Sequence, residues 1–526
     1  MKVDVTMYDV GLGSALLLTF WSDRDQVHVL ADGGNASAGP GVEDKLFRWL
    51  KPPGFGRPRI DLVIGTHYDA DHLDGITIIL KKRRIDIGQL WLPPVADDES
   101  GAEFGRLAGD ENLLANRFRG EGGDRAYQQY VAAKDRRRTT LRAIDTALER
   151  LSRGSDGPED RSDDALNIAD GDPVSAERPV DEWRSRFQTE VDHAYSIVGR
   201  RGCEHVPDAD VVREGTRFGY VLARLADAVE HGRALLRRDL GDWIFSRVDW
   251  PAGATRAARA ELAHMRIANA KDGINASALK SLVDALPNPC DILVECHGCS
   301  DRAPRAFAWT GRLFAPGRSG EVTATILSPT DRLIADRRDR IPKGVVAFRA
   351  KRWGHLEGLS DSNQLSYIIR FDAGGQGILV TGDSGFDGFA VGSDSAATYE
   401  TALTDKLKGV SVIQAPHHGG ISRHFYRAIE SAGFAEETQK TYLLLSHEAD
   451  SHHRPSMALA DYMSRLPSER PLELLFTNQP KPERVRGYRG RFASDVNQTG
   501  GQDGDVRLQF DGHEWTVVRH TIKPPA

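Results

Sequence analysis

The chain has 526 residues, of which 69 are basic and 76 acidic, and its formal net charge is −7. Hydrophobic residues make up 40% of the sequence and charged residues 28%. This composition excludes a disordered chain, a fibre and a uniformly basic nucleic-acid coat, and it leaves room for roughly two to four domains.

No apolar run approaches the roughly 20 residues that a membrane span needs. The N-terminal MKVDVTMYDV has one early Lys and enters an alternating pattern at once, unlike a secretory signal. Four cysteines, Cys203, Cys290, Cys296 and Cys299, are too few for a disulfide framework in a chain of this length. We therefore expect a cytoplasmic protein that does not enter the membrane.

Residues 1–95 are predicted to form short strands and helices in alternation. Strand-length apolar runs occur at Val3–Tyr8, Ala15–Phe20, Val27–Ala31, Asp61–Gly65 and Gln89–Leu92, and helical patterns occur at Val42–Leu50 and from Gly75 to Leu80. Strands that alternate with helices are typical of an α/β fold.

The character of the sequence changes near residue 96. From there to residue 286 the chain is charged, and apolar residues recur at helical spacing in Thr139–Leu151 and Arg217–Leu240. Gly154–Asp172 is rich in Asp, Gly and Ser and is predicted to be an exposed loop. We interpret residues 96–286 as a large, mostly helical insertion or lid, through which a partner protein could bind.

Strand patterns return in residues 287–526. They lie at Asp291–Glu295, Val322–Leu327, Gln364–Phe371, Gly377–Thr381, Val410–Ala415, Thr441–Ser446, Leu472–Thr477 and Val506–Phe510. We expect these strands to complete the α/β core, so that residues 1–95 and 287–526 meet at one cleft.

Four potential metal ligands follow one predicted strand within the segment Val63–Gly75, namely His67, Asp69, Asp71 and His72. Burying so many polar groups without a cation is costly. In an extended loop His67, Asp69 and Asp71 point to one side, whereas His72 points elsewhere. The loop can therefore serve two ions, with His67 and Asp69 on one and Asp71 and His72 on the other.

The H-x-D-x-D-H pattern of this loop resembles the H-x-H-x-D-H signature of the metallo-β-lactamase superfamily, with Asp69 in place of the middle His. The version with Asp resembles the soluble hydrolase domain of bacterial competence (DNA-uptake) channel proteins. Further segments resemble motifs of that family in the same order: Asp9–Gly13, Leu30–Gly34, Leu379–Asp383, Ala415–Gly419 and the region of His452–Ser456. Each motif alone is weak, but five in the right order are strong.

The resemblance covers about residues 1–95 and 320–515 and leaves out the charged insertion. It implies an αββα sandwich, in which two facing mixed sheets are flanked by helices. It also implies that Asp32 supports the site from behind the ligands, since carboxylates in such positions orient ligating imidazoles.

Two further ligands are expected from the second half of the chain. The apolar strand Gly377–Thr381 delivers Asp383 close to its end, in a position that suits a ligand shared by two cations. By the resemblance, one of His417 and His418 ligates a metal and the other contacts substrate. We favour His417 as the ligand and His418 as the catalytic contact.

The last motif departs from the family pattern, which has His directly before Pro. Here Arg454 occupies that place, after His452 and His453. Either histidine could supply the remaining ligand, or Arg454 could replace it with a phosphate-binding group. We favour His453 as the ligand and regard the nearby His447 as structural.

The ligand set predicts hydrolysis at a pair of divalent cations. Two such ions lower the pKa of a bridging water and stabilise an in-line displacement. Ligands that are His and carboxylate, without Cys, favour Zn²⁺ or Mn²⁺, and Asp69 makes its site harder than an all-His site. Asp71 or Asp383 would orient the hydroxide or receive its proton.

Three functions compete. A nuclease or phosphodiesterase acting on DNA or another phosphodiester is favoured. The alternative enzymatic function is hydrolysis of a lactam, ester or thioester in a small molecule. A non-catalytic module that binds a partner through the helical insertion is the third, and the intact ligand set argues against it.

Two other features are weighed separately. Cys296, His297 and Cys299 could bind a structural zinc, but the spacing lacks two C-x-x-C halves, and a role in a buried strand is favoured. Basic clusters such as Lys134–Arg138 could bind phosphates if several met around the cleft; further clusters are Arg200–Arg201, Arg237–Arg238, Arg337–Arg340 and Lys351–Arg352. Aromatic residues of the insertion could stack bases but are favoured as core residues: Tyr127, Tyr130, Trp243 and Trp250.

Overall fold

The computed structural model describes residues 1–22, 25–51, 56–94, 113–152, 178–198, 252–287, 292–300, 302–317, 319–338, 361–386, 389–391, 398–449, 451–493 and 504–522. The predicted helix Arg217–Leu240 and the predicted loop Gly154–Asp172 lie outside these residues. Several residues weighed above lie outside them as well: Cys203, Cys290, Trp243, Trp250, Arg200–Arg201 and Arg237–Arg238.

The chain divides into two compact units. The first, which we call the sheet unit, comprises Met1–Asn116, Ser281–Arg338 and Asp361–Ala526. The second, the helical unit, comprises Arg117–Lys280 and Asp339–Ser360. The first segment of the helical unit, Arg117–Lys280, begins later and ends earlier than the predicted insertion 96–286, and the second segment, Asp339–Ser360, lies outside it.

The first sheet of the sheet unit is mixed, with eight strands. In spatial order they are β18 (Trp515–Arg519), β17 (Val506–Phe510), β1 (Lys2–Met7), β2 (Leu16–Trp21), β3 (Gln26–Ala31), β4 (Arg59–Ile64), β5 (Asp86–Leu92) and β6 (Leu293–Cys296). The strands from β18 to β3 pair antiparallel, and those from β3 to β6 pair parallel. Residues from both ends of the chain therefore share this sheet.

The second sheet is also mixed and eight-stranded. Its order is β16 (Leu472–Phe476), β15 (Thr441–Leu445), β14 (Val410–Gln414), β11 (Gln376–Val380), β10 (Ile368–Ala373), β9 (Val322–Ser328), β7 (Arg305–Trp309) and β8 (Phe314–Pro316). The strands from β16 to β11 are parallel, and those from β11 to β8 are antiparallel. Each sheet thus has one parallel half, whose strands end together at one edge.

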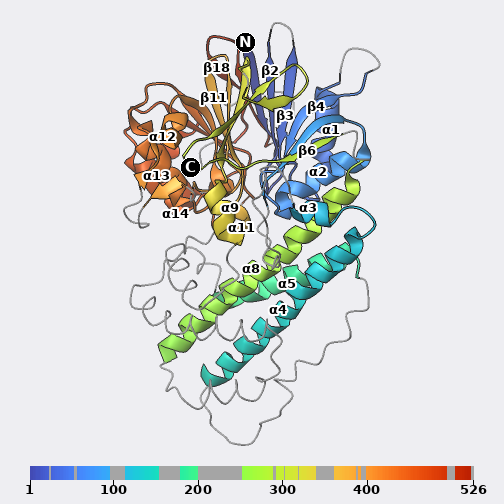
Figure 1. Ribbon diagram of the computed structural model, residues 1–526. Helices are drawn as coiled ribbons and strands as arrows, with labels where there is room; N and C mark the ends of the chain where they lie inside the picture. Colours follow the sequence, from blue (N-terminus) through green and yellow to red (C-terminus); the bar gives the residue numbers. More distant parts are fainter. Residues whose placement is uncertain are drawn as a thin grey trace, which may run out of the picture. The chain divides into compact units, whose positions relative to one another are not determined.

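One apolar core joins the two sheets. It contains alternate residues of β1, such as Val3 and Val5, together with Ala324, Ile326 and Phe371 of the second sheet. Helices α1 (Gly39–Trp49) and α2 (Ala70–Lys82) lie beside the first sheet, and α12 (Thr401–Leu407), α13 (Arg423–Ser431) and α14 (Met457–Arg465) beside the second (Figure 1). The prediction of an α/β fold is confirmed.

Strand positions follow the predicted apolar runs closely, with two kinds of difference. Edge and terminal strands β7, β8 and β18 were not predicted, because they are short and only partly buried. The strand predicted from Gln364 begins at Ile368 instead, because Asp361–Gln364 forms the short helix α11.

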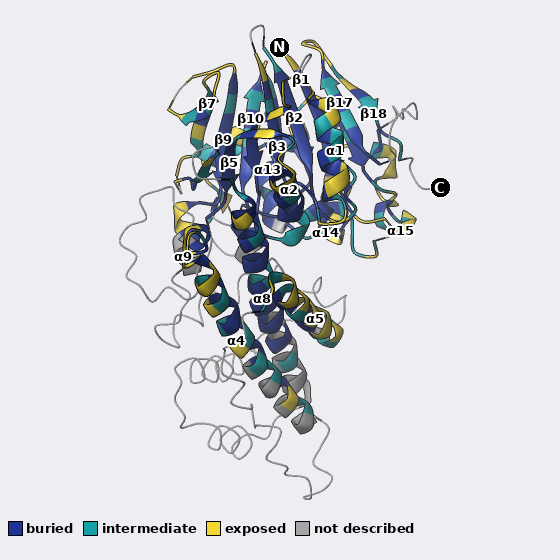
Figure 2. Cartoon of the chain, turned by 90° about the vertical axis from the view of Figure 1, so that its right-hand side faces the viewer, coloured by how far each residue is buried: buried dark blue, intermediate teal, exposed yellow. Residues whose placement is uncertain are grey.

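The helical unit is built on three long helices, α4 (Gly123–Ser152), α5 (Val180–Val198) and α8 (Ala252–Ala285), and Figure 2 shows much of α8 buried. Polar side chains hold the helices together: Arg266, only 1% exposed, pairs with Asp145 at 3.0 Å and also with Glu190. Tyr127 is buried, and its hydroxyl bonds Ser277 of α8 at 2.9 Å. Within the described part of the chain, no helix combines the length and apolarity that crossing a bilayer requires.

Candidate metal centre

The candidate site lies where parallel strands of both sheets end. Strand β4 leads through Gly65 and Thr66 to His67, and β11 leads through Thr381 and Gly382 to Asp383. Strand β14 leads to His417 and His418 in the short 3₁₀ helix η5 (Pro416–Gly419). Loops at the carboxyl ends of parallel strands are the usual place for ligand sites in open α/β sheets.

Helix α2 supplies the remaining residues from its first turn. Asp69 is the N-cap residue, but its carboxylate makes no capping hydrogen bond and instead lies 3.8 Å from His67 Nε2. Asp71 and His72 follow within the helix. A capping Asp normally accepts a hydrogen bond from the helix backbone, so this carboxylate is directed to the site.

The two oxygens of Asp383 face two different sets of side chains. Oδ2 lies 3.6 Å from His67 Nε2 and 3.8 Å from His417 Nε2. Asp69 lies against the same His67 nitrogen. We call His67, Asp69 and His417, with Asp383 Oδ2, the first donor set.

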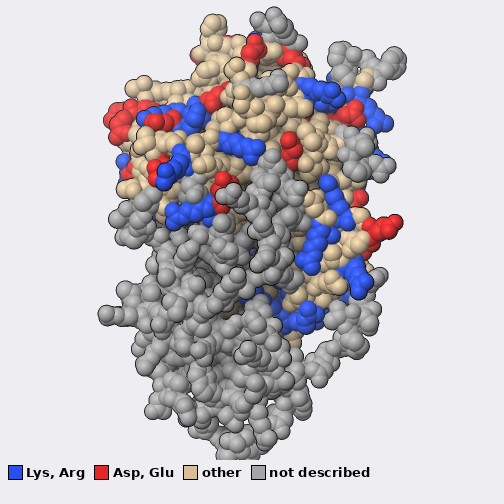
Figure 3. All heavy atoms as spheres, in the orientation of Figure 1, with Lys and Arg blue, Asp and Glu red and all other residues tan. Residues whose placement is uncertain are grey.

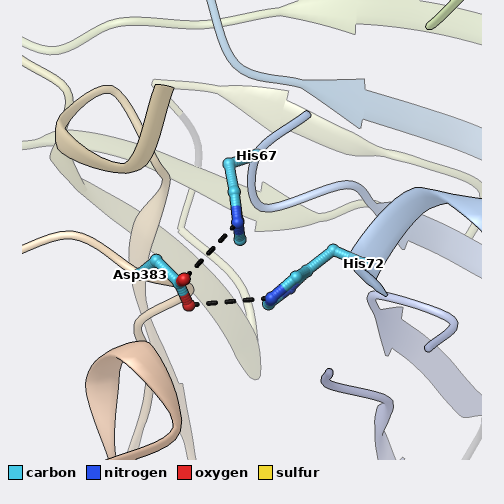
Figure 4. A group of neighbouring side chains, drawn as sticks. All are labelled: His67, His72 and Asp383. Atoms are coloured by element: carbon cyan, nitrogen blue, oxygen red, sulfur yellow. Dashed lines mark ion pairs between the residues drawn. The ribbon is translucent and has the colours of Figure 1, made fainter. Parts of the chain in front are cut away.

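The second donor set surrounds the other oxygen. Asp383 Oδ1 lies 3.6 Å from His72 Nε2 and 3.6 Å from His418 Nε2. Asp71 Oδ2 lies 3.8 Å from His72 Nε2 and 3.5 Å from His418 Nε2. Figure 4 shows the carboxylate of Asp383 between the rings of His67 and His72, one from each set.

These separations fit ligands of a shared ion better than hydrogen bonds. The nitrogen–oxygen pairs are too long for hydrogen bonds, whereas four ligands at about 2.0–2.1 Å in a tetrahedron lie roughly 3.3 Å apart. The facing Nε2 atoms of His72 and His418 are 3.1 Å apart. Two groups of converging ligand atoms could hold a metal ion among the described residues: His67, His72 and Asp383, and Asp71, His72 and His418.

Buried polar atoms without hydrogen-bond partners also indicate a metal site. His67 Nε2 and Asp383 Oδ1 are buried, and neither has a hydrogen-bond partner in the described structure. A buried polar atom without a partner costs about 1–3 kcal/mol. A cation in each donor set would satisfy both atoms, so the residues present fit metal ions.

The charges at the site favour ligation by the carboxylates. Burial opposes ionisation of Asp383, but the facing imidazoles, His67 foremost, hold its pKa well below the ordinary value. Burial likewise opposes ionisation of Asp71, yet His72 and His418 hold its pKa well below the usual range. Both carboxylates are therefore anionic at neutral pH.

The two histidines of the loop differ in protonation. Burial, reinforced by the charge of His72, lowers the pKa of His67, which is therefore neutral at pH 7. Burial would also lower the pKa of His72, but Asp32 and Asp71 outweigh it and raise that pKa to about 10. In the absence of a cation, His72 is thus protonated at neutral pH.

Asp32 holds His72 in place from the side away from the donor sets. Its Oδ2 accepts a hydrogen bond of 2.7 Å from His72 Nδ1, and its Oδ1 accepts one of 2.7 Å from the Thr66 backbone N–H. The Thr66 hydroxyl donates to Oδ2 at 2.8 Å. This leaves His72 Nε2 directed to the site, which agrees with the supporting role expected for Asp32.

The backbone of His417 and His418 is strained. Their φ angles are +52° and +55°, in the left-handed region that only a few per cent of residues other than Gly adopt. Such residues cost on the order of 1–3 kcal/mol each and collect at functional sites. The strain turns the two consecutive rings toward opposite oxygens of Asp383, which a regular strand or helix would not do.

Close backbone contacts set the position of the α2 loop. A Cβ at Gly75 would lie 1.7 Å from the carbonyl oxygen of Gly33, and one at Gly13 would lie 2.3 Å from that of Asp71. Gly33 N–H also donates to the His72 carbonyl at 2.9 Å. The glycines of the first two motifs therefore allow the main chain to approach the ligand loop directly.

The structure brings together most of the predicted site residues. His67, Asp69, Asp71, His72, Asp383, His417 and His418 all belong to the two donor sets. His417 faces Asp383 Oδ2 and His418 faces Oδ1, so both lie in ligand position, and the preference for His417 as ligand stays a prediction; His418 is also part of one of the converging groups. His418 is also the more buried of the two side chains, at 4% exposure against 19%.

His453 has no place in either converging group. It lies in the loop between β15 and α14, where its N–H donates to Ser451 Oγ. The residue of this loop that reaches the site is Arg454, whose Nε donates to the His417 carbonyl at 3.2 Å. Arg454 therefore contacts the backbone of the site, and His453 as a ligand stays a prediction.

Sequence analysis missed Asn363, which donates from Nδ2 to Asp383 Oδ2 at 3.2 Å. It lies in α11, just before β10, and β10 is paired antiparallel with the strand that leads to Asp383. The sequence offered one clue to Asn363: it is a polar residue that stands just before a buried strand, β10.

The segment Cys296–Cys299 and the basic cluster Lys134–Arg138 do not belong to the two donor sets. In the described structure the ligand atoms of Cys296, His297 and Cys299 form no converging group of three, and the rings nearest His297 are Trp91 and Phe307. In the cluster Lys134–Arg138, Lys134 and Arg138 are buried and paired with Asp272 and Asp135, whereas Arg136 is exposed and Arg137 half-buried. A phosphate-binding role for this cluster stays a prediction.

Tyr130 of the insertion is buried as well, as favoured. The side chains of Arg337–Arg340 and Lys351–Arg352 are outside the described residues. On the face shown in Figure 3, the described Lys and Arg side chains are interspersed with Asp and Glu.

Compared with protein-family models, with curated proteins and with solved structures, the chain has no match.

Proposed function

We propose that the protein is a hydrolase that activates water at two divalent cations held on either side of Asp383, and that its substrate is a phosphodiester. The observation that carries this proposal is the division of the donors between the two oxygens of one buried carboxylate. A carboxylate with two imidazole nitrogens facing each oxygen suits a ligand shared by two ions, and paired ions are typical of enzymes that hydrolyse phosphate esters.

The fold supports a place in the metallo-β-lactamase superfamily, in its αββα form, with the helical unit as an insertion. Two mixed sheets share a core, and helices lie beside each of them. The family motifs in Asp9–Gly13, Leu30–Gly34 and Leu379–Asp383 all lie at the candidate site, through Gly13, Asp32 and Asp383. We infer that the likeness to the hydrolase domain of competence proteins extends to this arrangement.

The donor chemistry suits Zn²⁺ or Mn²⁺, since imidazole and carboxylate bind both and no thiolate takes part. Such ions supply a water with a lowered pKa and neutralise charge that develops on the phosphate. Asp71 is the most exposed carboxylate of the cluster, at 26% against 15% for Asp69 and 5% for Asp383. It is therefore the best placed to orient water and to accept its proton.

Arg454 favours a phosphate over a neutral substrate. Its Nε is fixed on the His417 carbonyl, and its terminal amino groups have no partner in the described structure. The guanidinium fork matches the oxygens of a phosphate and stays charged at all relevant pH values. A lactam, ester or thioester has no comparable need for a fixed cation at this position.

The direct test is incubation of plasmid and single-stranded DNA with the protein and Mn²⁺. We expect cleavage that EDTA abolishes, because the ions activate the water, and we expect Asp71→Ala to lower the rate by about a thousand-fold, or roughly 4 kcal/mol. Far-ultraviolet circular dichroism should be unchanged by EDTA, since the sheets are built without the ions.

Asp405→Ala serves as the matched control for Asp71→Ala, because Asp405 is an exposed carboxylate on α12. Turnover of a chromogenic lactam or ester with inert DNA would instead indicate the small-molecule hydrolase. Absence of bound metal in elemental analysis would contradict both enzymatic functions.

Metal uptake should release protons. Because the pKa of His72 is raised to about 10 in the absence of a cation, the ring is protonated at neutral pH and must lose the Nε2 proton to ligate. We expect about one proton released per chain at pH 7.5, and an apparent affinity that rises about tenfold per pH unit below the pKa. His67, with its lowered pKa, should contribute little above pH 7.

Calorimetric titration with Zn²⁺ in buffers of different ionisation enthalpy measures this proton count. Asp32→Asn removes the charge that raises the pKa of His72, so it should lower the count and weaken binding by about 10–100-fold. A proton count that is zero in the unmodified protein would show that His72 is not a ligand.

A further inference from the structure

Two exposed apolar side chains lie beside the candidate metal centre and have no assigned role. Among the described residues, the large hydrophobic side chains that remain exposed are Leu12, Trp49, Leu293 and Met457. The guanidinium of Arg507 lies over the Trp49 ring at 4.2 Å, and Leu293 begins the edge strand β6. Leu12 and Met457, at 36% and 56% exposure, stand next to residues that contact the site. We call this pair the apolar rim.

Leu12 lies next to the main chain that carries Asp71. The following residue, Gly13, packs so closely against that chain that a Cβ there would lie 2.3 Å from the Asp71 carbonyl oxygen. Asp71 belongs to the second donor set, where its carboxylate faces His72 and His418. Leu12 is therefore one residue away from a direct contact with that set.

Met457 lies next to the main chain that carries His418. The preceding residue, Ser456, donates from its backbone N–H to the Gly419 carbonyl at 2.7 Å and from Oγ to the Gly420 carbonyl at 2.9 Å. Gly419 directly follows His418, which is another member of the second donor set. The second side chain of the rim is thus held as close to this donor set as the first.

Both sides of the rim contact the end of one strand. Strand β15 ends at Leu445, and a Cβ at Gly419 would lie 2.9 Å from Leu445 Cδ2. The next residue along the chain, Ser446, donates from Oγ to the Gly13 carbonyl at 2.8 Å. The two loops of the rim therefore contact consecutive residues, and both border the second donor set.

The exposure of Leu12 is fixed by the conformation of its loop. Gly11 and Gly13 have φ angles of +66° and +126°, which residues with a side chain rarely adopt. Asn35 Nδ2 donates to the carbonyl of Leu12 at 2.9 Å and to that of Val10 at 3.0 Å. Because the loop is already ordered, a ligand that covers Leu12 pays little conformational entropy for the main chain.

The surroundings of the rim suit a group with apolar faces, a polar edge and a phosphate attached. Arg454, two residues before Ser456, is fixed on the backbone of the site, and Asn35 lies beside Leu12. A long acyl chain would need a continuous apolar groove, whereas the rim offers two separate side chains. A nucleobase has flat faces that any apolar side chain can cover, and the thioether of Met457 makes favourable contacts with aromatic rings.

From this arrangement we propose that the apolar rim binds the base of the nucleotide whose phosphate reacts at the candidate metal centre. The inference rests on the proposed function for the identity of the reacting group. It adds that the substrate is a nucleic acid or a nucleotide ester, recognised through contact with a base, and not a phosphodiester without one.

The test compares two chromogenic esters with the same leaving group in the double variant Leu12→Asn/Met457→Gln of the full chain. Thymidine 5′-(4-nitrophenyl phosphate) carries a base, and methyl 4-nitrophenyl phosphate does not. With Mn²⁺, the ratio of kcat/KM for the first ester to that for the second should fall about tenfold in the double variant and about threefold in each single variant, because the base loses apolar surface to cover. The fall should come mainly from KM, since such a contact binds substrate and transition state alike.

The matched control is Leu293→Asn. Leu293 is an exposed leucine, at 46%, in β6, which lies two strands away from β4, the strand that leads to His67. This variant makes the same chemical change as Leu12→Asn and should leave the ratio unaltered. An unaltered ratio in the double variant, or an equal fall in the control, would overturn the inference. If turnover of octyl 4-nitrophenyl phosphate fell as far as that of the thymidine ester, the rim would be a general apolar contact, and its assignment to a base would be wrong.

A binding measurement separates this inference from the proposed function. Calorimetric titration with Zn²⁺ present compares thymidine 5′-phosphate with deoxyribose 5-phosphate, neither of which contains a phosphodiester. Thymidine 5′-phosphate should bind the unmodified protein about tenfold more tightly, and the double variant should lose this advantage. If the unmodified protein turns over neither ester, the proposed function fails, and the titration still decides the inference. Equal affinities in the unmodified protein, or no binding of either compound, would show that the rim does not bind a base.

Discussion

Under the proposed function, the variant Asp383→Asn is expected to bind one metal ion in place of two and to lose nearly all hydrolytic activity. Asp383 alone presents an oxygen to each donor set, at 3.6 Å from His67 on one side and 3.6 Å from His72 on the other. In the amide one oxygen becomes an NH₂ group, which donates hydrogen bonds and does not ligate metals. Loss of the shared anion should lower the rate by about a thousand-fold or more, or roughly 4 kcal/mol.

Elemental analysis of dialysed protein gives the metal content, and cleavage of DNA with Mn²⁺ gives the rate. Asp405→Asn is the control, because Asp405 is an exposed carboxylate on α12 whose only described partner is Lys408. Two bound ions and unimpaired cleavage in Asp383→Asn would remove the basis of the proposed two-metal site.

The variant Gly75→Ala is expected to show the largest loss of stability of any single methyl added near the site. The new Cβ would lie 1.7 Å from the carbonyl oxygen of Gly33, and the obstacle is main chain on both sides. The two segments are also bonded, since Gly75 N–H donates to the Gly34 carbonyl at 2.9 Å. We expect the free energy of unfolding to fall by roughly 3 kcal/mol or more.

Urea denaturation followed by circular dichroism measures this change. Gly41→Ala is the matched control: Gly41 lies exposed in α1, and a Cβ there would meet nothing within 4 Å. In a helix this substitution should raise stability by about 0.4–1 kcal/mol. If Gly75→Ala behaved like Gly41→Ala, the close approach of the ligand loop to the second motif would be wrong.

Asp383→Asn tests the chemistry of the site, and Gly75→Ala tests the packing that holds the site together. The site concentrates features that destabilise a fold, namely buried carboxylates, unsatisfied nitrogen atoms and two histidines with positive φ. Glycine contacts and the hydrogen bonds of Asp32 hold these groups together. Under the proposed function, the cations would return part of this free energy when they bind.

Much of this protein was determined by local sequence. Apolar runs of strand length predicted the strands that carry the site. Parallel strands are buried on both faces, so nearly all of their residues are apolar. The spacing of His67, Asp69, Asp71 and His72 directly after such a strand predicted a cluster of ligands. The motifs Asp9–Gly13 and Leu30–Gly34 were also visible in the sequence, whereas the close main-chain contacts of Gly13 and Gly33 were found only in the structure.

Other features depended on packing between distant segments. Which of His417 and His418 faces which oxygen of Asp383 is decided by two left-handed backbone angles, and no spacing rule encodes them. The role of Asn363 and the approach of Arg454 to His417 depend on loops from different strands meeting at one sheet edge. Lys134 and Arg138 looked like a basic surface in sequence, but helix packing buries them against Asp272 and Asp135.

There is a physical reason why some features could be predicted from the sequence and others only from the fold. Periodicity and local propensity act over a few residues, so a single sequence reveals elements and the short motifs at their ends. The direction in which a side chain points, and the charge it meets there, depend on strand order and on contacts between residues hundreds of positions apart, which only the folded chain brings together.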